Sequence, residues 1–174
     1  MTAFPTTDRT DHVLLQCHSD IDPLLPPGRC SYAQVVIRDP AGNVFQVTDN
    51  EDDDLGWEVP TWRARKDQAP HEAAQDAARH DVGTTLDTAT LRLLVVDHTP
   101  AGELSTEASW FVFDGGVLPA DRIAALMLPS PRAIDDGRCF TDPKGIRTAR
   151  VQAALTRLTD PSAPVYLVDG EPAA

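Results

Sequence analysis

Hydrophobic residues occur along the chain in short runs that polar turns separate, and this pattern predicts a protein rich in β-strands. The run YAQVVIR at 32–38 is followed, after the turn DPAGN at 39–43, by VFQVTD at 44–49, which predicts a hairpin. Two longer apolar runs predict two further strands, largely buried, at 91–98 and 108–116.

One helix has clear start and stop signals at residues 70–82. Pro70 suits the first helical turn, no glycine interrupts the segment, and Gly83 suits the stop. Small side chains on one stripe would let this helix lie close to a sheet. That stripe carries Ala74, Ala77 and Ala78, and the opposite stripe carries Glu72, Asp76 and His80.

Weaker patterns predict the remaining elements. Two short strands are expected at 13–17 and at 57–60, the second ended by Pro60, and an edge strand is expected at 165–170. Helices are expected at 120–127 and 146–158, with an irregular segment at 129–145. Strands that flank helices at this spacing predict an α/β sandwich with a mixed sheet. We expect one domain over 31–174 and an N-terminal arm over 1–30, where polar residues and prolines gather.

Charge and length narrow the function classes. The chain has 174 residues, enough for one core, and 15 Lys and Arg against 27 Asp and Glu give a net charge of -12. Such a charge opposes binding to nucleic acid or an anionic membrane, so we expect a small-molecule partner and leave a homodimer open. The three cysteines are widely spaced, which favours reduced thiols. No apolar stretch is long enough to cross a bilayer, so we expect a cytoplasmic protein.

The stretch WEVPTWRARKDQAPHEAAQDAARHDVGTTL at 57–86 resembles the Nudix box region. In that region a Trp-Glu-Leu-Pro-Gly-Gly strand leads through a loop into an Ala-Ala-containing helix that a glycine ends. The hairpin before it, the segment at 111–129 and the C-terminal runs also look like those of actinobacterial Nudix proteins, so the resemblance covers about 31–170. It implies a Nudix-like α/β/α sandwich with a mixed central sheet.

The chain departs from the Nudix pattern where Nudix pyrophosphohydrolases hold magnesium. Thr61 and Trp62 stand where the Nudix pattern has two glycines, and Gln68 stands where it has a glutamate in the loop. The positions of its three metal-binding glutamates are occupied by Ala77, His80 and Asp81. Magnesium requires hard oxygen ligands at near-octahedral geometry, and only Asp81 remains a carboxylate among those three. We expect weak magnesium binding at best.

A rebuilt site on the helix is one interpretation of these departures. Asp76 and His80 lie four residues apart on one face with Asp81 adjacent, and we predict them as catalytic residues and as a metal site. Such a mixed set suits manganese, zinc or iron better than magnesium. An exposed helix face with i,i+4 charge pairs is the commoner meaning of the same pattern.

The loop before the helix holds the candidate substrate-binding residues. Arg63, Arg65 and Lys66 are cations that pair well with phosphate or carboxylate, although they also suit a solvated loop. Trp62 either fills the space of the lost glycine or stacks on a flat ligand. His98, which follows Asp97 at a strand end, is a secondary candidate.

Three functions remain open. The first is a divergent Nudix enzyme that acts on a small phosphorylated or anionic metabolite, by hydrolysis of a diphosphate linkage with impaired or altered metal use. The second is metal-independent acid/base chemistry, such as isomerisation or cyclisation, with His80 or Asp81 as acid and base. The third is a non-catalytic sensor of a nucleotide or metabolite.

Overall fold

The computed structural model describes residues 29–48, 57–87, 91–102, 106–126, 137–163 and 165–173. Most of the expected arm at 1–30 lies outside these residues, and so do the expected strand at 13–17 and Cys17. None of the helices in the described part of the chain is long and apolar enough to cross a lipid bilayer.

The described helices are interspersed among the strands along the chain. In chain order they are β1 (Cys30–Arg38), β2 (Val44–Val47), β3 (Thr61–Arg63), α2 (Pro70–Asp81), β4 (Arg92–Thr99), β5 (Ala108–Val117), α3 (Ala120–Leu126), β6 (Arg138–Thr141), the 3-10 turn η1 (Pro143–Gly145), α5 (Ala149–Thr159), β7 (Tyr166–Val168) and β8 (Glu171–Pro172).

All the described strands belong to one mixed sheet with the order β6-β2-β1-β5-β4-β7-β8, and β3 pairs with β1 beside this path. The pairs β1–β5 and β4–β7 are parallel, and the other pairs are antiparallel. The predicted hairpin of β1 and β2 and the mixed sheet are therefore confirmed.

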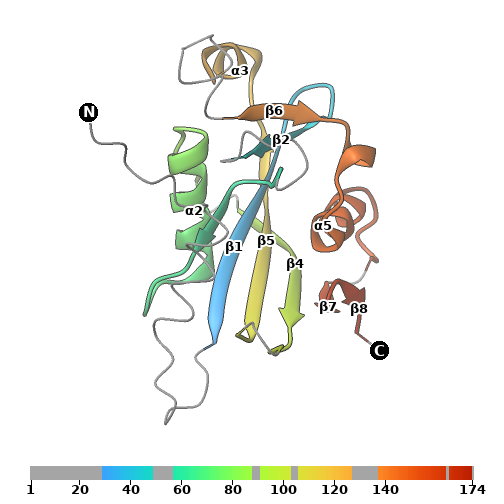
Figure 1. Ribbon diagram of the computed structural model, residues 1–174. Coiled ribbons are helices and arrows are strands. Elements are labelled where there is room, and N and C mark those ends of the chain that lie inside the picture. Colours follow the sequence, from blue (N-terminus) through green and yellow to red (C-terminus); the bar gives the residue numbers. More distant parts are fainter. Residues whose placement is uncertain are drawn as a thin grey trace, which may run out of the picture.

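Helices cover both faces of the sheet, with α2 on one side and α5 on the other (Figure 1). Alternate residues of β1 face opposite sides because successive side chains of a strand do so. Ala33, Val35 and Ile37 join the core beneath α2, whereas Val36 joins the core beneath α5. The predicted α/β/α sandwich is confirmed.

The alanine stripe of α2 lies against the sheet as its spacing predicts. Ala73, Ala74, Ala77 and Ala78 are fully buried in the core cluster that includes β1. The helix starts at Pro70, and the Glu72 carboxylate accepts a hydrogen bond from the Ala69 amide at 2.9 Å. It stops where Gly83 adopts a φ of +65°, a conformation that glycine adopts without strain.

Three sequence predictions need correction. No ladder forms at 57–60, where Glu58 makes only an isolated bridge to Val47. The strand β3 instead follows Pro60, which has no amide hydrogen to donate to a ladder. The segment expected to be irregular contains β6, whose four residues are too few to show a periodicity, and β6 pairs with β2.

The third correction is the start of the last helix, which is Ala149 rather than residue 146. Ile146 caps η1 in an extended conformation and is buried under α5, so its apolar side chain belongs to the core without belonging to the helix. The predicted edge strand is present as β7, and the short strand β8 pairs outside it.

Candidate active site

The end of α2 and the strand β3 bring together three residues that the sequence singles out. Nδ1 of His80 lies 2.7 Å from Oδ1 of Asp81, and the Trp62 ring lies beside the imidazole with a centroid distance of 5.2 Å. The Asp81 side chain is 3% exposed, whereas the His80 side chain is 59% exposed. A buried carboxylate therefore holds an imidazole that is open to solvent.

Asp76 is engaged by two neighbours instead of being open to a ligand. Its Oδ1 pairs with Nη1 of Arg79 at 2.7 Å, and its Oδ2 accepts a hydrogen bond from Nε2 of Gln68 at 2.8 Å. Oε1 of Gln68 also accepts a hydrogen bond from the Arg65 amide at 3.0 Å. An amide at position 68 can donate and accept, whereas the family's glutamate would repel Asp76.

The donor set does not fit the magnesium site that the Nudix resemblance implies. Within the described ranges no group of three or more His, Cys, Asp or Glu side chains is placed to hold a metal ion. Ala77 has no atom that could bind a metal ion, and Asp76 is already paired with Arg79. The Trp62 ring, which stands where the Nudix pattern has a glycine, packs against the alanine core. The metal set of Asp76, His80 and Asp81 stays a prediction.

The predicted substrate-binding residues do not share one face of the sheet. Trp62 is paired with Ala33 and packs in the α2 core, whereas Arg63 is paired with Tyr32, whose neighbours lie on the other face. Arg65 and Lys66 are exposed on the turn that leads to α2. Arg65 and Lys66 are therefore the cations that remain on the loop, while Arg63 faces away from Trp62.

A polar cluster beneath α5 was not found from the sequence. The fully buried Gln34 accepts a hydrogen bond from Nε of Arg150 at 2.8 Å and donates to Glu58 at 3.3 Å. The Arg150 guanidinium lies 3.8 Å from the centre of the Trp110 ring. Burial lowers the pKa of Arg150, and the charges of Glu58 and of the buried Asp97 oppose that shift. The only sequence signal was a polar residue inside an apolar strand.

His98, the secondary candidate, is tied to a different group. Its Nε2 lies 3.5 Å from Oε1 of Glu107, and Glu107 also pairs with Arg29 at 3.1 Å. Asp97, its neighbour, is buried and accepts a hydrogen bond from the Gly170 amide at 3.0 Å. His98 therefore does not join His80 and Asp81. The Cys30 thiol is buried 3.6 Å from Oγ1 of Thr106, and the Cys139 thiol lies 3.2 Å from Oγ1 of Thr141.

The comparisons with known proteins rest on structure. No family model matches the chain, and no curated protein matches its sequence. The fold is similar to that of a MutT protein from Methanosarcina mazei, with a TM-score of 0.53 and 16% identity over 78% of this chain and 96% of the other. The chain thus has a MutT/Nudix-type fold.

Two other solved structures are similar at a lower level. A Nudix hydrolase family member from Chromobacterium violaceum has a TM-score of 0.46 and 13% identity, covering 78% of this chain and 79% of the other. An Ap4A hydrolase from C. elegans has a TM-score of 0.45 and 14% identity, covering 74% of this chain and 95% of the other.

Proposed function

We propose that this Nudix-fold chain is a metal-independent acid/base enzyme that acts on a small anionic metabolite, with His80 as the group that carries the proton. The observation that carries the proposal is the pairing of the exposed imidazole of His80 with the buried carboxylate of Asp81. The reaction class is isomerisation or cyclisation.

The pairing determines which nitrogen of His80 can react. A carboxylate accepts a hydrogen bond, so the neutral imidazole carries its proton on Nδ1 and keeps its lone pair on Nε2. No described residue hydrogen-bonds to Nε2. Asp81 would also stabilise the imidazolium that forms when Nε2 takes a proton. The reactive nitrogen therefore faces solvent with its orientation held from behind.

The neighbouring groups would bind the substrate. Trp62 offers an aromatic surface next to the imidazole, which suits a flat or apolar part of a metabolite. The Gln68 side chain hydrogen-bonds both to the Arg65 amide and to Asp76, and so links the turn that carries Arg65 to α2. Asp76 lies about one helical turn, or about 6 Å along the helix axis, before His80. We assign Arg65 and the adjacent Lys66 to an anionic group of the substrate.

The chemical step needs no further reactant. Nε2 of His80 removes a proton from the substrate, the electrons of the broken bond stay on the substrate, and the imidazolium returns the proton to another atom of the same molecule. Arg65 and Lys66 would offset the negative charge that builds up. The proposal assigns no step to a metal ion because the described donors do not fit one.

A turnover screen run with a chelator and, in parallel, with added manganese, zinc or magnesium tests the proposal. The full chain is incubated with nucleoside diphosphate sugars, dinucleoside polyphosphates, ADP-ribose and other small anionic metabolites, and both isomeric products and released phosphate are measured. We expect turnover that survives chelation and is lost in His80→Gln. The side chain of His80 is 59% exposed, so this variant should keep the fold.

The matched control is His71→Gln, which removes an exposed histidine from the same helix. Turnover that persists in His80→Gln, or that falls equally in His71→Gln, would overturn the role of His80. Phosphate release that depends on manganese, zinc or magnesium would instead support the diphosphate hydrolase. Tight binding of a metabolite without any product would support the sensor and overturn the enzyme.

A further inference from the structure

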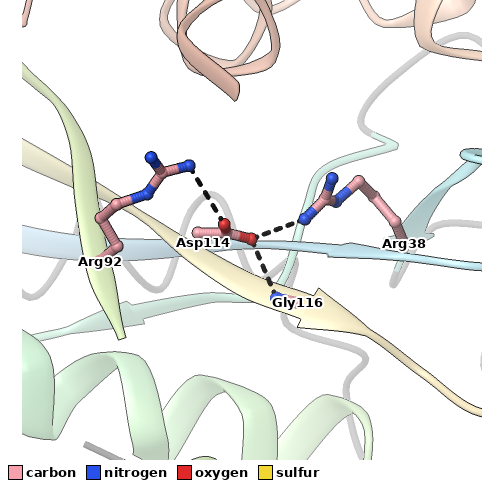
Figure 2. A network of polar contacts seen from close by, with 4 residues as sticks. All are labelled: Arg38, Arg92, Asp114 and Gly116. Carbon is pink, nitrogen blue, oxygen red and sulfur yellow. Dashed lines mark hydrogen bonds and ion pairs between the residues drawn. The ribbon is translucent and has the colours of Figure 1, made fainter. Parts of the chain in front are cut away.

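Two arginines share one aspartate on the face of the sheet away from α2 (Figure 2). Oδ1 of Asp114 accepts hydrogen bonds from Nη2 of Arg38 at 2.9 Å and from the Gly116 amide at 3.0 Å. Oδ2 of Asp114 lies 3.5 Å from Nη2 of Arg92. Figure 2 shows the two guanidinium groups approaching the carboxylate from opposite sides.

An irregularity in the pairing of β1 and β5 brings these residues together. Val36 is opposite Asp114 and Arg38 is opposite Val117, so β5 has one more residue than β1 between these pairs. Gly116 takes a φ of +79° there, and a Cβ on Gly115 would lie 2.5 Å from a methyl group of Val35. The two glycines therefore permit the bulge that turns Arg38 toward Asp114.

The cluster holds more positive charge and more hydrogen-bond donors than it uses. Two guanidinium groups face one carboxylate, which leaves one positive charge in a chain whose net charge is -12. Nε of Arg38 is buried, and no described residue accepts a hydrogen bond from it. Asp114 is also the only described residue that pairs with Arg92.

Asp39, the acid next to Arg38 in the chain, forms no ion pair with it among the described residues. Both of its carboxylate oxygens instead accept hydrogen bonds from Asn43, each at 2.8 Å. These hydrogen bonds, first that of the Asn43 side chain, lower the pKa of Asp39 and hold it in the turn. The N–H groups of Arg38 and Arg92 that do not bind Asp114 can therefore donate hydrogen bonds to a ligand.

We propose that Arg38 and Arg92 form a binding site for the phosphate group of a small molecule, with Asp114 holding the two guanidinium groups in place. Guanidinium groups present paired donors that match the oxygens of a phosphate, and the cluster keeps one net positive charge to attract that anion. The Arg38 side chain is 24% exposed and the Arg92 side chain is 54% exposed, so a ligand can reach the cluster from solvent.

This site is separate from the proposed active site. Asp114 is opposite Val36, which faces α5, whereas His80 lies on α2 across the sheet. Figure 2 shows the three charged side chains on the side of the sheet away from α2. The phosphate site therefore does not depend on the proposed function, and either one can fail alone.

Calorimetric titration of the full chain with inorganic phosphate at low ionic strength tests the site. We expect saturable binding that is at least about tenfold weaker in Arg92→Gln, because this variant loses one of the two guanidinium groups. The control is Arg29→Gln, which removes another exposed arginine from an ion pair, that with Glu107. Sodium chloride at matched ionic strength separates binding at the site from screening.

Asp114→Asn distinguishes a binding site from an ion pair that only supports the sheet. Asparagine keeps a side-chain oxygen that accepts hydrogen bonds from the guanidinium groups but carries no charge. Phosphate binding should therefore strengthen, and the melting temperature of the variant should rise with added phosphate. A purely structural network predicts a lower melting temperature that phosphate does not restore. The proposal is overturned if the parent chain takes up no phosphate, or if Arg29→Gln weakens binding as much as Arg92→Gln.

Discussion

Replacing Ala77 with glutamate would return to α2 a carboxylate at a position where the Nudix pattern has a metal-binding glutamate. In this chain Ala77 is fully buried in the alanine stripe that meets β1, and Trp62 packs against the same core. A glutamate there would have to bury its charge, take up a proton or push the helix away from the sheet. We expect Ala77→Glu to destabilise the fold.

The burial of Ala77 sets the size of the effect. An unpaired charge in a core costs about 3 to 5 kcal/mol, and overpacking of a close helix–sheet contact adds to it. For a domain of this length each kcal/mol lowers the melting temperature by about 2 to 4 °C, so we expect a fall of about 6 °C or more. Magnesium should not restore the loss, because Asp76 is paired with Arg79 and the described donors do not form a metal group.

Thermal unfolding with and without magnesium measures both effects. The matched control is Ala124→Glu, which makes the same substitution at an exposed position in α3 and should change the melting temperature little. A glutamate at position 77 that is tolerated as well as one at position 124 would refute the packing argument. A rise in the melting temperature of Ala77→Glu alone on adding magnesium would show that position 77 opens onto a cation site.

Two further predictions concern polar contacts outside the proposed sites. Arg150→Met should lower the free energy of unfolding in urea by about 1 to 3 kcal/mol, because the buried Gln34 oxygen loses its donor, whereas the exposed Arg147→Met should have little effect. Asn43→Ala removes the side-chain hydrogen bond that lowers the pKa of Asp39 below 3.8. A lowered pKa stabilises the fold above that value, so the loss should be present at neutral pH and shrink as pH falls below 3.8, as melting curves across pH would show.

Local patterns in the sequence were enough to predict most elements. Alanine spacing, Pro70 and Gly83 determine where α2 lies and which of its stripes meets the sheet, because helix periodicity and terminal signals act over a few residues. The elements that the sequence missed are short. Strand β6 exists because β2 offers it a partner, and no pattern within four residues reports that partner.

The candidate site was only partly predictable for the same reason. The adjacency of His80 and Asp81 was visible in the sequence, but the burial of one side chain and the exposure of the other were not. The sequence predicts Trp62 and Arg63 as substrate-binding residues of one loop. The alternation of side chains along β3 instead places them on opposite faces of the sheet. Pairing with β1 decides which face each residue takes.

The sequence by itself determined the order of most elements, the alanine stripe of α2 and the residues that stand at positions 77, 80 and 81, since these depend on neighbours along the chain. Only the tertiary structure decided which polar residues within apolar strands found partners. Gln34 meets Arg150 across 116 positions, and Asp114 meets Arg38 across 76. Such contacts depend on strand register and helix docking, which hydrophobic periodicity does not encode.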